Sequence, residues 1–148
     1  MTEADREPQP SGSDDDQNDD TTTEYGEFPL KRFLGMEVDG GDPGIGTARV
    51  AVGDDHLNPN GVVHGAVLFA LVNTAMGKAT MSVIDDGRFC ASIEVSLRFI
   101  RPAAAGDLTA VANVVKRGRS VVHLDARVLG DDGRLIATAA GTFAIIDL

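Results

Sequence analysis

Residues 58–75, NPNGVVHGAVLFALVNTA, join a loop to a long apolar segment. The loop belongs to residues 53–61, GDDHLNPNG, whose glycine, proline, asparagine and aspartate residues favour turns. From residue 62 to about residue 83, apolar side chains recur every three or four positions, which predicts a helix. Because the other faces of this helix are also apolar, we expect it to be buried. Some of its residues are small and would let a neighbouring backbone approach closely: Ala66, Ala70, Ala75, Gly77 and Ala79.

The segments around this helix are read mostly as β-strands. Four stretches after it alternate or run apolar and are separated by turn-rich sequences: 91–100, 107–116, 121–129 and 134–146. The DDG sequence at 131–133 predicts a hairpin between the last two. Residues 45–52 are read as an earlier strand, and an apolar cluster at 28–36 is expected to form one or two helical turns over a sheet edge. The predicted class is α+β, with one long buried helix against an antiparallel meander of four strands, completed by at least one earlier strand.

The acidity of the chain is concentrated at its N-terminus. The 148 residues carry a formal net charge of −10 at pH 7, and residues 1–25 hold nine of the 23 acidic residues beside one arginine. Residues 1–25 contain no Ile, Leu, Val or Phe and cannot bury enough apolar area to offset the entropy of ordering. We expect a disordered acidic tail over 1–26, with a partner-binding acidic arm as the alternative, and one domain over 27–148. The negative charge repels phosphate, which disfavours nucleic acid as a partner.

The amino-acid usage also bears on the environment of the protein. Ten arginines stand beside three lysines, and 17 aspartates beside six glutamates, a bias that resembles proteins of salt-loving organisms. Cys90 is the only cysteine and the N-terminus does not resemble a signal peptide, so we expect a cytoplasmic protein without an intrachain disulfide. The apolar run at 61–77 includes His64 and Asn73, which favours a buried helix over a membrane span.

Metal and nucleotide motifs are absent from the sequence. His56 and His123 lack metal-ligand spacing with any cysteine or carboxylate, so no metal site is expected. The glycines at 40–46 precede a predicted strand instead of a helix, which is not the context of a phosphate-binding loop. Cys90 has no evident histidine partner and is interpreted as a small core residue.

The loop and helix together resemble a known family. The pattern N-P-N-G-x-x-H-G-A, followed by L-x-N at residues 71–73, is similar to that of the phenylacetate-degradation type of hotdog-fold acyl-CoA thioesterases. Further pieces match in the same order, and the resemblance covers about residues 28–146: Ser92 and Glu94, FIRP at 99–102, GD at 106–107, GR at 118–119 and ATAAGTF at 137–143. The resemblance implies a hotdog fold, in which an antiparallel sheet wraps around a long central helix.

The resemblance also implies roles for residues of the motif. The backbone N–H of Gly65, at the start of the helix, would stabilise negative charge on the thioester oxygen. His64 would orient the loop or contact the carbonyl, although a histidine that simply caps the helix is the alternative. Asn58 would be a second polar contact beside the thioester. The family carries an acid, supplied by the partner subunit, where this chain has Asn73; an amide cannot act as nucleophile or base but can hold a water molecule.

Two residues on the strand beside the helix are candidates to assist. Ser92 would position water, and Glu94, two residues later, would share its face by strand alternation and could replace the missing acid. The alternative for Glu94 is an ion pair with Arg98 or Arg101. Alanine at position 66, where the family usually has a second glycine, would narrow the approach slightly. The phosphates of coenzyme A would be contacted by residues in loops near the tunnel mouth: Arg101, Arg117, Gly118 and Arg119.

Three functions follow from these features. The first is hydrolysis of aryl- or fatty acyl-CoA thioesters, and the second is acyl-CoA binding with little or no turnover because of Asn73. A hotdog hydratase or dehydratase ranks last because the helix offers no acid to pair with His64. Coenzyme A would enter as part of the substrate, and no other cofactor is expected. A sheet edge and a site that draws on two chains imply a homodimer or homotetramer, with no membrane partner.

Overall fold

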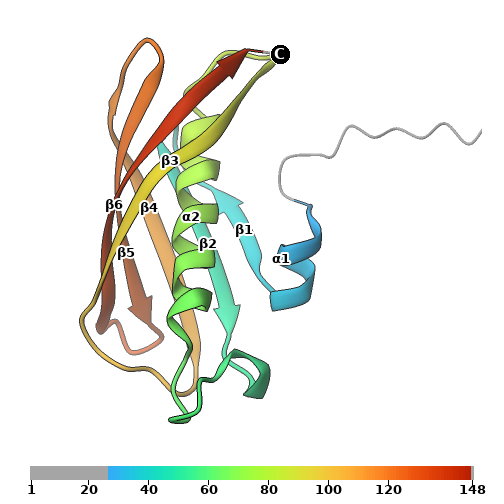
Figure 1. Ribbon diagram of the computed structural model, residues 1–148, viewed down its shortest axis with the longest axis vertical. Helices are drawn as coiled ribbons and strands as arrows, with labels where there is room; N and C mark the ends of the chain where they lie inside the picture. The colour runs from blue at the N-terminus through green and yellow to red at the C-terminus, as the bar shows by residue number, and fades with distance from the viewer. Residues whose placement is uncertain (1–26, 148) are drawn as a thin grey trace, which may run out of the picture.

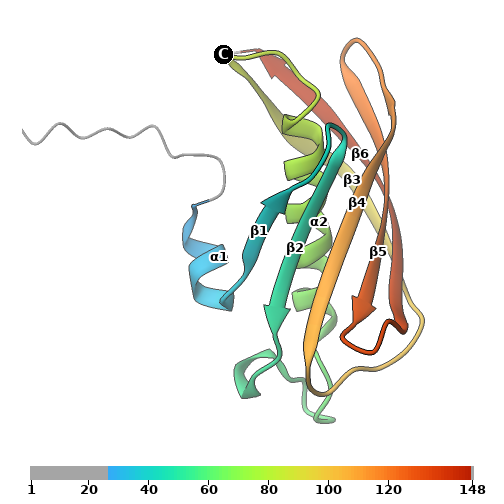
Figure 2. The same ribbon diagram turned by 180° about the vertical axis from the view of Figure 1, so that it is seen from behind.

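The fold consists of one long helix held against a curved antiparallel sheet (Figures 1 and 2). The computed structural model describes residues 27–147, so the predicted acidic tail at 1–26 lies outside the described residues. The elements follow in the order α1 (Pro29–Leu34), β1 (Glu37–Gly40), β2 (Ile45–Ala51), the short 3₁₀ helix η1 (Asp54–His56), α2 (Gly65–Met81), β3 (Arg88–Phe99), β4 (Asp107–Arg117), β5 (Val121–Gly130) and β6 (Leu135–Asp147). This arrangement confirms the predicted α+β class and the hotdog fold.

The sheet has six strands in the order β1-β2-β4-β5-β6-β3, and every pairing is antiparallel. The prediction of a continuous four-strand meander after the helix is wrong in one respect. Strand β3 pairs with β6 at the far edge, and β4 instead pairs with β2. Alternation of apolar and polar residues predicts that a segment is a strand. It does not predict which strand pairs with it, because pairing depends on contacts between distant residues. Strand β1 was not predicted.

Helix α2 lies in the concave side of the sheet and supplies much of the core. Its inward residues include Leu71, Val72, Ala75, Met76 and Ala79, all fully buried. They pack against the buried faces of β2, β4 and β5, whose residues alternate between buried and exposed. The buried, largely apolar helix expected from the sequence is confirmed.

The helix and sheet approach each other closely at glycines. A Cβ placed on Gly46 of β2 would lie 2.2 Å from the carbonyl oxygen of Ala75 and 2.6 Å from the amide nitrogen of Ala79. A Cβ on Gly141 of β6 would lie 2.5 Å from the sulfur of Met76. The small residues of α2 and of the strands therefore set the depth to which the helix sinks into the sheet.

Candidate active site at the start of the central helix

The NPNG loop is shaped by its own asparagine. The Asn58 side-chain oxygen accepts hydrogen bonds from the backbone N–H groups of Asn60, at 2.9 Å, and Val62, at 3.3 Å. Gly61 has a φ of 75°, a left-handed conformation that suits glycine. The loop ends in a bridge between Leu57 and Val63, which leads directly into α2. Because the oxygen of Asn58 is engaged within the loop, its amide nitrogen is the group that remains to contact a ligand.

His64 is the N-cap of α2. Its Nδ1 accepts a hydrogen bond from the backbone N–H of Ala66 at 2.9 Å, which leaves the side-chain proton on Nε2. The backbone N–H of His64 donates to the carbonyl oxygen of His56 at 2.8 Å. The capping role considered from the sequence is therefore present. It does not exclude a second role, since the exposed ring retains an Nε2–H donor.

Gly65 is the first residue of α2, so its N–H lies at the positive end of the helix dipole. Within residues 27–147 no acceptor for this N–H is found. A Cβ on Gly65 would lie 3.0 Å from Cζ of Phe99, whose ring covers the glycine. Gly65, Asn58 and Arg101 line one hollow of about 380 Å³, together with Phe99. Three of the predicted site residues thus come together here.

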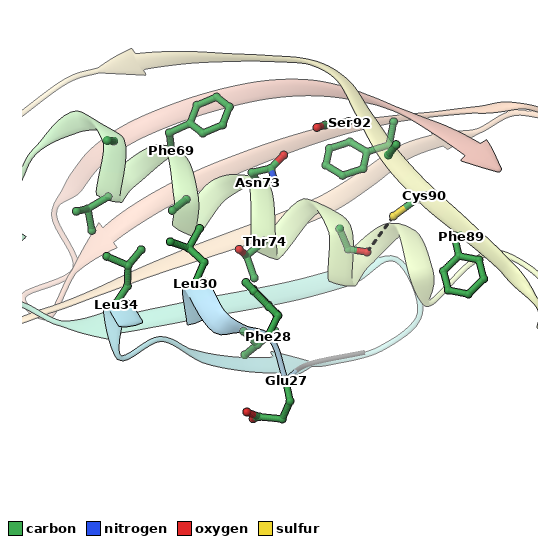
Figure 3. Close-up of a pocket in the computed structure, with 17 residues that line it drawn as sticks. Glu27, Phe28, Leu30, Leu34, Phe69, Asn73, Thr74, Phe89, Cys90 and Ser92 are labelled. Atoms are coloured by element: carbon green, nitrogen blue, oxygen red, sulfur yellow. Dashed lines mark hydrogen bonds between the residues drawn. The ribbon is translucent and has the colours of Figure 1, made fainter. Parts of the chain in front are cut away.

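A larger, mostly apolar pocket of about 860 Å³ opens further along α2 (Figure 3). Asn73 of α2 and Ser92 of β3 project into it from opposite walls, and both were predicted site residues. The Asn73 side-chain oxygen is buried and has no hydrogen-bond partner among the described residues. Most other lining groups are apolar: Phe28, Leu30, Leu34, Val38, Ala66, Val67, Phe69, Ala70, Phe89, Ala91 and Phe143. An unpaired amide oxygen in such a wall indicates a place where a water molecule or ligand donates a hydrogen bond.

The two parts of the predicted site are separated within one chain. Gly65 and Asn73 are eight residues apart on α2, which corresponds to about 12 Å at the helical rise of 1.5 Å per residue. They also line different hollows. A single thioester carbonyl therefore cannot contact the Gly65 N–H and a water molecule held by Asn73 of the same chain.

Glu94 does not face the helix, which corrects the prediction that it shares the face of Ser92. The pairing of β3 with β6 shifts between Ser92 and Glu94, so Ile93 is an extra residue in a β-bulge. One added residue reverses the alternation. Glu94 instead lines a hollow of about 260 Å³ on the outer face of the sheet with His123 and Asp125. The alternative ion pair of Glu94 with an arginine is also not found among the described residues.

The predicted phosphate contacts divide between the two ends of the molecule. Arg101 lies beside Gly65, whereas Arg117 ends β4 and Gly118 and Arg119 lie in the β4–β5 turn, at the opposite end of the molecule (Figure 1). Arg117 lies 3.6 Å from Asp85, which follows the C-terminal end of α2. The 17 residues of α2 span about 25 Å. These residues therefore do not form one cluster with Arg101 in a single chain.

Glu27 is the one carboxylate among the described residues that line the larger pocket. Its side chain points away from the pocket and pairs with Lys31 (Figure 3). The hydrogen bond from Lys31, followed by the charge of the same ammonium, lowers the pKa of the Glu27 carboxyl. A carboxylate with a lowered pKa is a weaker base, so Glu27 does not replace the acid missing at Asn73.

Other residues of the site region were missed or interpreted differently. Cys90 was interpreted as a core residue, and it packs beside the core but also lines the larger pocket. Phe99, over Gly65, and His56, which is 8% exposed, were not selected. Phe99 is the first residue of the FIRP motif, which is a sequence signal for it, whereas His56 belongs to no such motif. Residues 27–147 contain no cluster of three or more His, Cys, Asp or Glu able to hold a metal ion. No helix in this range is long and apolar enough to cross a membrane.

Comparisons with known proteins agree with the fold. The acyl-coenzyme A thioesterase PaaI of Escherichia coli is 29% identical over 111 residues, which cover 74% of this chain and 77% of that protein. The solved structure of E. coli PaaI, from the phenylacetic acid degradation operon, has a TM-score of 0.75 at 26% identity and covers 82% of this chain and 87% of its own. The structure of the conserved protein PA5202 of Pseudomonas aeruginosa has a TM-score of 0.79 at 29% identity. The match covers 84% of this chain and 99% of that chain. The sequence profile described as the thioesterase superfamily matches residues 60–137, so the chain belongs to the thioesterase superfamily.

Proposed function

We propose that the protein hydrolyses acyl-CoA thioesters to a free acid and coenzyme A, at a site that two chains build together. The observation that carries the proposal is the 12 Å gap, by the helical rise, between Gly65 and Asn73 on one helix. A two-fold related copy closes such a gap by placing its Asn73 half against the Gly65 half of the first chain. Each dimer then has two complete sites.

The edge strand β3 is the surface through which the second copy binds. It forms one edge of the sheet, so one side of its backbone is not paired with another strand within residues 27–147. Large apolar side chains are exposed along and beside it: Phe89 (46%), Ile93 (59%), Phe99 (59%) and Ile100 (47%). Antiparallel pairing of two β3 edges buries these side chains and, in the arrangement we propose, brings the start of α2 in one chain beside Asn73, in the middle of α2, in the other. Arg117 and Arg119 of one chain then approach Arg101 of the other, where they contact the phosphates of coenzyme A.

In this site the thioester carbonyl lies at the start of α2. The Gly65 N–H and the positive end of the helix dipole stabilise the negative charge that develops on the carbonyl oxygen. The Nε2–H of His64 and the amide nitrogen of Asn58 are further donors on the same loop. The acyl group extends into the apolar pocket, whose volume of about 860 Å³ lies within the usual range for small-molecule sites.

Asn73 and Ser92 of the second copy hold the attacking water. The unpaired Asn73 oxygen accepts a hydrogen bond from the water, and the Ser92 hydroxyl can donate or accept another. Neither group removes a proton efficiently, so the proton passes to bulk solvent and the thiolate of coenzyme A leaves. A general base is worth about 10² to 10⁴ in rate, so we propose slow turnover relative to a family member with an acid at this position.

Complementation between two variants tests the shared site. Gly65→Val disables the carbonyl half, and Asn73→Ala disables the water half. Each homodimer should lose most of its activity. Random exchange of subunits makes half of the dimers mixed, and each mixed dimer has one intact site, so about a quarter of the wild-type number of sites should be restored. Release of free coenzyme A from a panel of aryl and fatty acyl-CoAs is the measurement. Restored activity supports the composite site, and a mixture as inactive as its components would contradict it.

Binding without turnover is the second candidate function. It is favoured by Asn73 and by the absence of a usable carboxylate among the described residues that line the pocket. Calorimetry distinguishes it from hydrolysis: wild-type protein would then bind the acyl-CoA with no release of coenzyme A over hours. If neither binding nor release occurs with any member of the panel, both candidate functions are wrong.

A further inference from the structure

His56 is a buried histidine whose two ring nitrogens both have partners. It is 8% exposed, Nδ1 accepts a hydrogen bond from the Gly53 backbone N–H at 3.0 Å, and Nε2 lies 2.8 Å from the carbonyl oxygen of Leu34. A carbonyl oxygen can only accept, so Nε2 carries the proton and Nδ1 is the acceptor. The ring is therefore a neutral linker between two segments 22 residues apart in sequence.

These two bonds join α1 to the loop before the candidate site. Leu34 is the last residue of α1, and the side chains of Leu30 and Leu34 form one wall of the apolar pocket (Figure 3). No residue of α1 is buried, and among its side chains only Leu34 packs against the core, so few contacts hold the helix in place. The backbone carbonyl of His56 also accepts the N–H of His64 at 2.8 Å. One residue thus connects the pocket wall to the start of α2.

We propose that His56 is a positioning residue that holds the α1 wall of the apolar pocket and so sets how tightly the protein binds long acyl groups. The proposal rests on the proposed function, since it assigns the acyl group to this pocket. His56 does not contact the thioester in this scheme and acts through Leu34. Loss of its bond to Leu34 therefore weakens the binding of acyl groups that reach α1, and leaves the carbonyl chemistry unchanged.

Two substitutions separate the two bonds of the ring. The side-chain oxygen of asparagine can take the place of Nδ1, so His56→Asn keeps the bond from Gly53 but does not reach Leu34. The terminal nitrogen of glutamine can take the place of Nε2, so His56→Gln keeps the bond to Leu34 and loses the one from Gly53. His123→Asn is the matched control, because His123 is an exposed histidine on the outer face of the sheet.

The affinity for dodecanoyl-CoA and butanoyl-CoA, measured by calorimetry, is the first readout, and kcat and KM for both substrates are the second. For His56→Asn we expect the Kd and KM of dodecanoyl-CoA to rise about 3- to 10-fold, the effect of one lost hydrogen bond. The Kd and KM of butanoyl-CoA should stay within about twofold of wild type, because the short butanoyl group does not reach α1. The kcat for both substrates should also stay within about twofold, because His56 does not contact the thioester. His56→Gln should restore the dodecanoyl-CoA affinity, and His123→Asn should not change it.

Hydrogen exchange provides a readout that needs no ligand. The amides of residues 29–36 should exchange faster in His56→Asn than in wild type or His56→Gln, while those of α2 keep their rates. Two results for His56→Asn would overturn the proposal. One is an affinity for dodecanoyl-CoA and for butanoyl-CoA that is unchanged from wild type. The other is a loss of affinity that is equally large for both. If the wild-type protein releases no coenzyme A, only the hydrolase function is contradicted. The role of His56 is still tested by the acyl-CoA affinities and by the hydrogen exchange of residues 29–36. If His56→Asn does not fold, a dodecanoyl-CoA affinity of His56→Gln that falls 3-fold or more would contradict the proposal.

Discussion

Asn73 is the residue on which the proposed turnover depends. It lies in the middle of α2 with its side-chain oxygen buried and unpartnered among the described residues, and Ser92 faces it across the pocket (Figure 3). An amide in this place is large enough to hold a water molecule and too weak a base to activate it. The pocket is therefore equipped for positioning a nucleophile, and the gain from adding a base can be measured directly.

Asn73→Asp should raise kcat for acyl-CoA hydrolysis by about 10² to 10⁴. The carboxylate is nearly isosteric with the amide, so KM should change little. Steady-state release of free coenzyme A checks this, with Asn113→Asp, on β4, as a control for the added charge. A kcat unchanged by Asn73→Asp would mean that Asn73 does not face the attacking water.

Glu94→Ala should leave kcat/KM within about twofold of wild type, because the bulge at Ile93 places Glu94 on the outer face of the sheet. Ser92→Ala, on the inner face, should lower kcat by about tenfold through loss of one hydrogen bond to the water. The two variants are assayed in parallel on the same substrate. A larger loss in Glu94→Ala than in Ser92→Ala would reverse the assignment of faces.

At the scale of elements, the contact between α2 and β2 sets how closely the helix packs on the sheet. Gly46 allows the backbones to meet, since a Cβ there would lie 2.2 Å from a backbone oxygen of α2. Backbone atoms cannot move aside as a flexible side chain can. This contact keeps the C-terminal half of the helix, around Ala75 and Ala79, deep in the sheet.

Gly46→Ala should therefore destabilise the fold by about 1 to 3 kcal/mol or more, the usual cost of overpacking. Urea denaturation followed by circular dichroism measures the change. Gly53→Ala is the control, because no atom lies within 4 Å of a Cβ at that position. Equal unfolding midpoints for Gly46→Ala and wild type would show that α2 shifts without cost.

At the scale of the whole molecule, one chain offers two separate halves of the proposed site. The Gly65 half and the Asn73 half lie in different hollows, and the apolar edge strand β3 runs beside both. Dimerisation through this edge would cover exposed apolar side chains and complete two sites in one step. Assembly and activity should then be lost together.

Ile93→Lys should shift the protein toward monomer and lower kcat/KM at least tenfold at micromolar concentration, because a charge is placed in the paired edge. Sedimentation velocity and the coenzyme A release assay check the two effects. Val115→Lys adds the same charge at a side chain of similar exposure, 62% against 59%, on β4 away from that edge. A fully active monomer would contradict the site shared between two chains.

The sequence alone was sufficient to predict the long buried helix, most of the strands, the loop before α2 and the grouping of Asn58 with Gly65. Those features depend on local periodicity, turn chemistry and neighbouring positions, which are readable along the chain. The partner of β3, the outward face of Glu94 and the separation of Arg101 from Arg117 and Arg119 were decided by tertiary structure. Strand pairing and one bulge set these positions, and both arise from contacts between residues far apart in the chain.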